Sequence, residues 1–147
     1  MANKVNWSDY PAEVTYLSTE INALADGGND LGATIDNSAN GDMYMDLELY
    51  LAEQGSARDT GAFVALYILP SVDGVNFCYG GDSLDPPANT HRANFLFDAA
   101  VTARYSTVIH ILLPAGLFRM LVMNETGQTF AATGNTLKYT LYNEEIQ

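Results

Sequence analysis

Cysteine, basic side chains and histidine are all scarce in this 147-residue chain. With one cysteine, Cys78, the chain cannot form an internal disulfide or a zinc site built from cysteines. Only 6 Lys and Arg residues stand against 18 Asp and Glu residues, which gives a net charge of −12 and a pI near 4.1. Nucleic-acid binding needs a basic surface for the phosphates, and an anionic membrane repels an acidic protein. We therefore expect no nucleic-acid partner and no membrane partner.

Long apolar runs are also missing. No segment approaches the roughly 18 consecutive apolar residues of a transmembrane helix. The first seven residues (MANKVNW) lack the apolar segment of a signal peptide, so we expect a protein that is made in a cytoplasm and not exported by the secretory route. Apolar residues still make up 48% of the chain, so it can bury a core, and its length fits one domain.

The clearest structural signal is an alternation over residues 42–51. Its apolar members are Met43, Met45, Leu47, Leu49 and Leu51, and between them stand Tyr44, Asp46, Glu48 and Tyr50. Because side chains on a strand alternate between faces, this pattern predicts a strand with an apolar face and a polar, partly aromatic face. Asp46 and Glu48 then point the same way.

Further strands are expected at residues 62–69, 75–79, 93–97, 105–113, 117–124, 128–132 and 136–142, with an irregular loop at 80–92. In 105–113, alternation places Tyr105, Ile109 and Ile111 on one face and Val108 and His110 on the other. Turn residues such as Asp73-Gly74 recur at the spacing typical of a sandwich or barrel. The sequence therefore predicts an all-β fold, an antiparallel β-sandwich of about eight strands.

Two parts of the chain are candidates for protein contacts. Residues 1–12 show little periodicity and read as an N-terminal arm preceding a sandwich domain at 13–147, with Trp7 and Tyr10 as possible aromatic anchors. On the polar face of 42–51, Tyr44 and Tyr50 could cover a protein partner or stack on a sugar. A protein interface is the interpretation we favour for these four residues.

No catalytic, cofactor-binding or metal-binding residue is assigned. His91 and His110 lack a nucleophile motif nearby, and Ser106 is not in a G-x-S-x-G sequence. Glycosidases need only two carboxylates, so Asp46 and Glu48, about 7 Å apart on a strand, leave a small hydrolase as a minor hypothesis. With 18 acidic residues in the chain such a pair is also expected by chance. We expect a protein that is not an enzyme and has no cofactor.

A series of turn and strand-end segments in the second half of the chain carries a family resemblance. The segments are 69–77 (LPSVDGVNF), 85–87 (DPP), 113–118 (LPAGLF), 133–138 (TGNTLK) and 142–145 (YNEE). In this order they resemble small β-sandwich virion proteins of tailed bacteriophages, notably capsid cement or decoration proteins. The resemblance covers roughly residues 13–145.

The resemblance implies a jelly-roll-like domain that is oligomeric and bound to the outside of a capsid. Its partners would be the major capsid protein and further copies of itself, with a trimer favoured over a dimer because cement proteins often sit on local three-fold axes. The protein would be made in the host cytoplasm and located on the virion. The acidic composition agrees with an exterior position, because packaged DNA would repel it. The alternative is a carbohydrate- or receptor-binding module of a phage tail or appendage.

Overall fold

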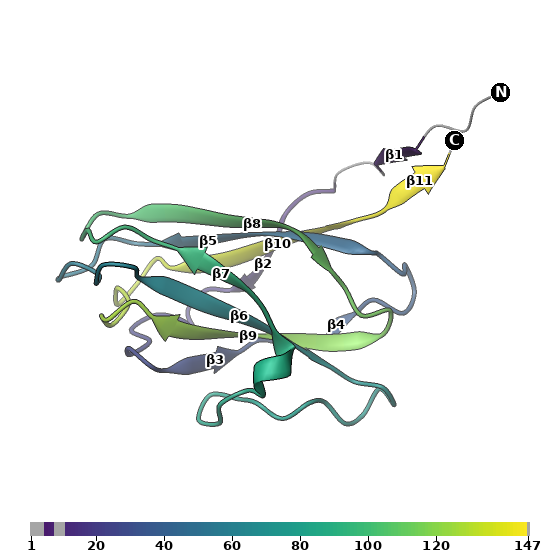
Figure 1. Cartoon of the computed structure of the whole chain (residues 1–147), viewed down its shortest axis with the longest axis horizontal. Helices are drawn as coiled ribbons and strands as arrows, with labels where there is room; N and C mark the ends of the chain where they lie inside the picture. Colours follow the sequence, from purple (N-terminus) through teal and green to yellow (C-terminus); the bar gives the residue numbers. More distant parts are fainter. Residues whose placement is uncertain (1–4, 8–10, 147) are drawn as a thin grey trace.

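The computed structural model describes residues 5–7 and 11–146, with side chains for residues 11–144. These residues form β-strands and one short 3₁₀ helix, η1 (Ala88–Thr90), so the predicted all-β class is confirmed. Two antiparallel sheets pack against each other, and we call them the upper and the lower sheet from their places in Figure 1.

The upper sheet has the order β2 (Val14–Leu17), β10 (Thr136–Tyr142), β5 (Tyr44–Leu51), β8 (Arg104–Leu112). The lower sheet has the order β3 (Asn29–Leu31), β9 (Leu117–Glu125), β6 (Phe63–Pro70), β7 (His91–Leu96), and β4 (Ile35–Asp36) also pairs with β9. Two connections between successive strands stay within the lower sheet: β3 to β4 and β6 to β7. The other connections between strands of the sandwich cross from one sheet to the other. This winding is that of a jelly roll, as predicted.

Both ends of the described chain leave the sandwich together. β1 (Val5–Trp7) pairs with β11 (Glu144–Ile146), and the pair projects from one end of the sandwich in Figure 1. β11 follows β10 after a single residue, so the C-terminal residues lie beside β1 and not in either sheet. The division into an arm at 1–12 and a domain at 13–147 stays a prediction.

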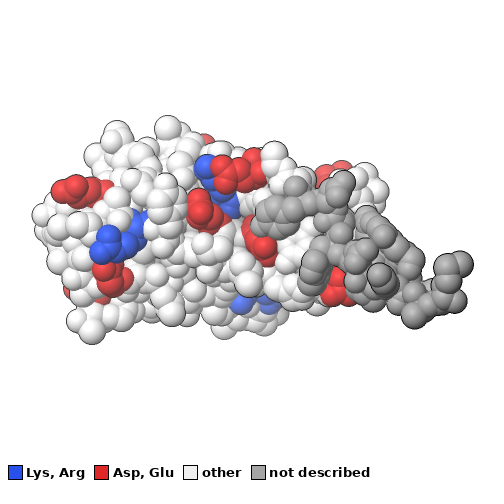
Figure 2. Space-filling view, turned by 90° about the horizontal axis from the view of Figure 1, so that it is seen from above, with Lys and Arg blue, Asp and Glu red and all other residues white. Residues whose placement is uncertain are grey.

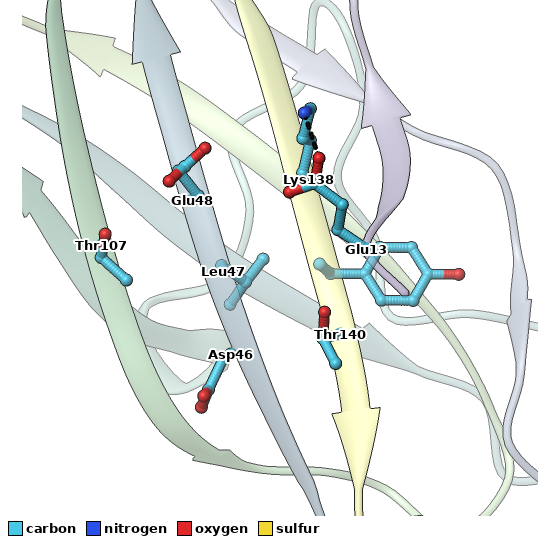
Figure 3. Close-up of a pocket in the computed structure, with 8 residues that line it drawn as sticks. Glu13, Asp46, Leu47, Glu48, Thr107, Lys138 and Thr140 are labelled. Carbon is cyan, nitrogen blue, oxygen red and sulfur yellow. Dashed lines mark hydrogen bonds and ion pairs between the residues drawn. The ribbon is translucent and has the colours of Figure 1, made fainter. Parts of the chain in front are cut away.

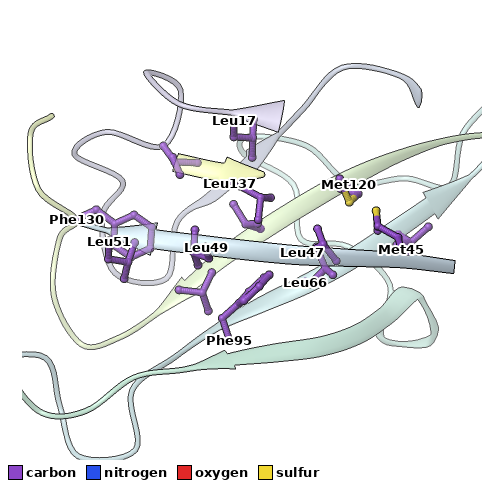
Figure 4. Packing of buried hydrophobic residues seen from close by; sticks show 14 of the residues in the cluster. Leu17, Met45, Leu47, Leu49, Leu51, Leu66, Phe95, Met120, Phe130 and Leu137 are labelled. Carbon is purple, nitrogen blue, oxygen red and sulfur yellow. The ribbon is translucent and has the colours of Figure 1, made fainter. Parts of the chain in front are cut away.

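The core lies between the two sheets. On β5, Met45, Leu47, Leu49 and Leu51 are buried, as the alternation predicts. They meet apolar side chains of the lower sheet such as Leu66, Phe95 and Met120 (Figure 4). The prediction is wrong for Met43, which is 44% exposed. The chain enters β5 only at Tyr44, and the Met43 N–H donates to the Asn143 side chain at 2.7 Å.

The outer face of the lower sheet is covered by the long connection between β6 and β7. Ala65, Leu69 and Leu121 are buried on that face although they do not belong to the central core. The predicted strand at 75–79 is wrong. The Asp73 carboxylate accepts the N–H groups of Val75 and Asn76 at 2.9 and 2.7 Å, and the chain turns into a loop with a single bridge to Phe77.

The predicted strand at 128–132 is also absent, because side chains bind its carbonyl groups. The Asn124 amide donates to the Gln128 carbonyl at 2.8 Å, and the Gln54 amide donates to the Thr129 carbonyl at 3.0 Å. At the same end of the sandwich, the fully buried Arg58 guanidinium donates to the carbonyls of Asp98 and Thr102. These contacts hold the connecting loops together without a further strand.

A β-bulge in β8 changes which residues face the core. The pairing of β8 with β5 shifts register between Met45 and Leu47, and His110 has a φ of +62°, which is rare for a residue other than glycine. Val108 and Ile111 therefore both pack against the core. Ile109 is 66% exposed, so its predicted position on the same face as Ile111 is wrong.

Candidate binding surface on the upper sheet

The outer face of the upper sheet carries an ordered array of polar and aromatic side chains. The strand register sets it out in rows across β10, β5 and β8: Thr136, Tyr50 and Tyr105; Lys138, Glu48 and Thr107; Thr140 and Asp46; Tyr142, Tyr44 and Leu112. The two middle rows are polar, and each outer row contains two tyrosines. This arrangement follows from the two-residue period of the strands, which repeats polar positions on one face.

A groove with a volume of about 320 Å³ lies over the middle rows (Figure 3). Its polar lining includes Asp46, Glu48, Thr107 and Thr140, and an ion pair between Lys138 and Glu13 borders it. The hydrogen bond to Glu13 raises the pKa of the Lys138 ammonium group above its usual value. We call this feature the upper groove.

Two polar groups of the upper groove have unused hydrogen-bonding capacity. Thr140 is only 5% exposed and lines the groove beside Asp46, but its hydroxyl makes no hydrogen bond with the residues that the structure describes. The Glu48 carboxylate, on the strand position opposite Lys138, is partly exposed and also makes no hydrogen bond with the described residues. Both groups can therefore form hydrogen bonds with a polar molecule in the groove.

At one end of the groove, an aromatic cluster fixes the Asp46 carboxylate. The rings of Tyr44 and His110 stack with centroids 4.0 Å apart, and the Tyr142 hydroxyl donates to Asp46 Oδ1 at 2.9 Å. The backbone N–H of His110 donates to the same oxygen at 2.8 Å, which is possible because the bulge turns that N–H toward β5. His110 Nδ1 lies 3.2 Å from the Tyr142 hydroxyl oxygen.

At the other end, Tyr50 and Tyr105 form a tilted pair with ring centroids 4.6 Å apart. Tyr105 is 66% exposed, so much of its ring is open to solvent. Figure 2 looks onto this outer face and shows acidic side chains spread across it, with Lys and Arg beside some of them. The outer face of the upper sheet therefore has two aromatic ends and a charged middle.

The structure separates the four predicted interface residues. Tyr44 and Tyr50 lie on the outer face of the upper sheet at opposite ends of the upper groove. The backbone of Trp7 pairs with Glu144, but its side chain lies outside the described residues, as does all of Tyr10. Sequence reasoning missed Tyr142, although the alternation of residues 136–142 places it on the same side as Thr140.

The carboxylates of Asp46 and Glu48 share one face, as predicted. They are neighbours on a single strand, and Asp46 already accepts hydrogen bonds from Tyr142 and from the His110 backbone. His91 pairs with the Asn94 side chain at 2.8 Å, away from both acids. A hydrolytic role for Asp46 and Glu48 remains a hypothesis from the sequence.

A second distinctive surface is the side of the sandwich where β7 and β8 lie next to each other. We call it the β7–β8 side. On these two strands, Ile109 and Leu112 of β8 and Leu96 of β7 are 66%, 65% and 70% exposed. Neither strand contains Asp or Glu, and Arg92 and Arg104 are their charged residues. In a chain with a net charge of −12, these two strands carry exposed apolar side chains and no acid of their own, and Asp98, in the connection between them, is ion-paired with Arg104 at 3.0 Å.

On the opposite side of the sandwich, acidic residues gather near β3. Partial burial raises the pKa of Asp30 to about 6, and the nearby charges of Asp82 and Glu20 add to this effect. In the part of the chain that the structure describes, no group of three His, Cys, Asp or Glu residues is arranged to hold a metal ion. None of the helical segments described is long and apolar enough to cross a membrane.

The sequence matches no protein-family model and no curated protein.

Proposed function

We propose that the chain is a non-enzymatic virion protein that binds the outer surface of a phage capsid and stabilises it by bridging major capsid subunits. The observation that carries this proposal is the β7–β8 side, where Ile109, Leu112 and Leu96 are exposed in strands that contain no acid. Exposed apolar side chains of this kind are typical of protein-binding surfaces. The jelly-roll winding supports the proposal, because this fold occurs in viral capsid domains.

The same reasoning supports self-association, with a trimer favoured by the resemblance to cement proteins. β8 is an edge strand, and between Arg104 and Leu112 it has no charged residue that would oppose pairing with another strand. It can therefore also pair with a strand of a neighbouring chain. Weak contacts repeated over many copies would hold the layer on the capsid through avidity. The arm at residues 1–12 would add anchors through Trp7 and Tyr10.

The test uses undecorated, expanded capsids of the virus that encodes the chain. Full-length protein should sediment with these shells and raise the temperature at which they rupture, because a ligand that binds only the assembled lattice stabilises it. Protein lacking residues 1–10 should stay folded but bind more weakly. Binding to isolated capsid protein should be poor.

A pair of matched variants tests the β7–β8 side itself. Ile109→Asp should weaken capsid binding about tenfold or more, as expected for an apolar residue at the centre of an interface. Val72→Asp adds the same charge at a fully exposed position in the β6–β7 connection and should bind like the unaltered protein. If the full-length protein does not sediment with shells, or leaves their rupture temperature unchanged, the capsid proposal fails and the appendage module replaces it. Equal binding by the two variants would show that the β7–β8 side is not the contact.

A further inference from the structure

We propose that the upper groove is a binding site for a neutral, linear oligosaccharide. This inference goes beyond capsid binding and rests on different residues: the groove is lined by Glu13, by residues of β5 and β10 and by Thr107 of β8, whereas the capsid proposal rests on Ile109, Leu112 and Leu96. Three properties of the groove identify the ligand class: the polar lining, the aromatic ends and the sign of the charge.

The lining offers the hydrogen-bonding groups that sugar hydroxyls need. Glu48 presents carboxylate oxygens that accept hydrogen bonds, and Thr140 presents a hydroxyl that both donates and accepts. Neither group forms a hydrogen bond with the described residues, and Thr140 is 5% exposed. A ligand hydroxyl in the groove would form hydrogen bonds with these groups in exchange for those that they otherwise form with water.

The aromatic ends match the apolar faces of sugar rings. A pyranose ring carries C–H groups on its faces and hydroxyls around its rim, so it stacks on an aromatic ring while its rim forms hydrogen bonds. Tyr44 and Tyr50 are six residues apart on β5, a separation of about 20 Å at the usual rise per residue. Tyr105 extends the second end with an open ring. This length suits a chain of several sugars better than a single one.

The charge of the groove selects against anionic glycans. Glu13, Asp46 and Glu48 line the groove, and its cation, Lys138, is already paired with Glu13. Carboxylate, sulfate or phosphate groups on a ligand would be repelled by this excess of negative charge. A protein segment is also a poorer fit, because protein interfaces have apolar centres depleted of charge, and the centre of this array is charged and hydroxyl-bearing.

The experiment titrates isotope-labelled full-length protein with neutral α-linked and β-linked tetrasaccharides of hexoses and N-acetylhexosamines, followed by NMR. A tetrasaccharide of uronic acids serves as the anionic comparison. At least one neutral probe should shift the amide signals of β5 and β10 at millimolar concentration or below, and the anionic probe should not. Binding by the uronate probe alone, or shifts confined to other strands, would overturn the proposal.

Two pairs of variants then test the residues named. Tyr105→Ala should weaken binding about three- to tenfold through the loss of one aromatic contact. Tyr79→Ala removes a similarly exposed tyrosine from the β6–β7 connection and should leave affinity unchanged. Glu48→Gln should weaken binding about tenfold through the loss of a charged acceptor, and Glu53→Gln, in an exposed loop, should have no effect.

All four variants alter solvent-accessible positions, and unfolding curves would confirm that each is folded. If no neutral tetrasaccharide binds at millimolar concentration, or if the groove variants bind as well as their controls, the upper groove is not a glycan site. Neither result depends on capsids, so failure here is distinct from failure of the capsid proposal.

Discussion

Replacing Leu47 by alanine tests the arrangement of the sandwich most directly. Leu47 lies in the middle of β5, is 1% exposed and packs in the core between the two sheets. The substitution removes three carbon atoms, worth about 2.4 kcal/mol at about 0.8 kcal/mol for each buried CH₂ group. Its cross-strand neighbours, Tyr139 and Val108, pack against the same core from the flanking strands.

Tyr139 and Val108 limit how far the surrounding structure can close over the space left by the Leu47 side chain, because both belong to strands whose registers are fixed by pairing with β5. A residual cavity then adds about 1–2 kcal/mol, so the total loss in the free energy of unfolding should be about 4 kcal/mol. With a urea m-value of about 2 kcal/mol/M for a domain of this size, the midpoint of unfolding should fall by about 2 M.

The matched control is the next residue, Glu48, which points to the outer face. Glu48→Ala should change the free energy of unfolding by less than about 0.5 kcal/mol, as surface substitutions usually do. Circular dichroism during urea unfolding measures both variants. Equal losses at the two positions would refute the assignment of Leu47 to the core and of Glu48 to the outer face.

Three further changes probe the loops and the acidic residues. Arg58→Ala should cost about 3 kcal/mol, because it removes a fully buried side chain and leaves the buried Gln54 side-chain oxygen and the Asp98 and Thr102 carbonyls without this donor, and urea unfolding measures this loss. Gly80→Ala should cost about 1–3 kcal/mol, because φ is +145° and a Cβ would lie 2.9 Å from Leu69, whereas Gly81→Ala, with open space around it, should be nearly neutral in the same assay. For Asp30, the folded-state pKa of about 6 exceeds the ordinary value of 3.8, so the protonated carboxyl stabilises the fold below about pH 4 and this contribution is lost as the pH rises through 6. Asp30→Asn should therefore raise stability at pH 7 by about 1 kcal/mol, after allowance for partial exposure, and not at pH 4, as thermal unfolding at the two pH values would show.

The sequence predicts best those strands that have one buried and one exposed face. In β5 and β10, alternating side chains face either the core or the outer surface, so a local pattern carries enough information. The segment 75–79 has residues suited to a strand, but the Asp73 side chain captures the N–H groups that a ladder would need. Such competition between a side chain and the ladder is hard to weigh from composition alone.

The bulge at His110 shows a different limit. A residue with a β-carbon rarely takes a φ of +62°, so no local signal marks this position. Its N–H is held by Asp46, which is 64 residues away in the chain. The bulge depends on the pairing of β8 with β5, and it determines that Ile109 is exposed and that the partly buried Ile111 packs against the core.

The candidate site could be predicted only in part for the same reason. Tyr44, Asp46, Glu48 and Tyr50 share a face because they alternate on one strand. Thr140 and Tyr142 join them only through the register of β10 against β5, which a single sequence without a known pairing does not specify. The upper groove is thus a product of strand pairing, whereas its central strand is visible in the sequence.

The distribution of charge favours separate roles for the two surfaces. Residues 13–36, which include β2, β3 and β4, contain five acidic residues and no basic one, whereas β7 and β8 contain two arginines and no acid. Copies of an acidic chain repel one another through their negative charges. This repulsion is weakest at the β7–β8 side, where the strands contain no acid, so a protein contact is most favourable there. The upper groove keeps acidic groups at its centre, which disfavours an acidic protein partner and leaves room for a neutral, hydroxyl-rich ligand. A capsid contact at one edge and a glycan on the outer face therefore place compatible demands on the same sandwich.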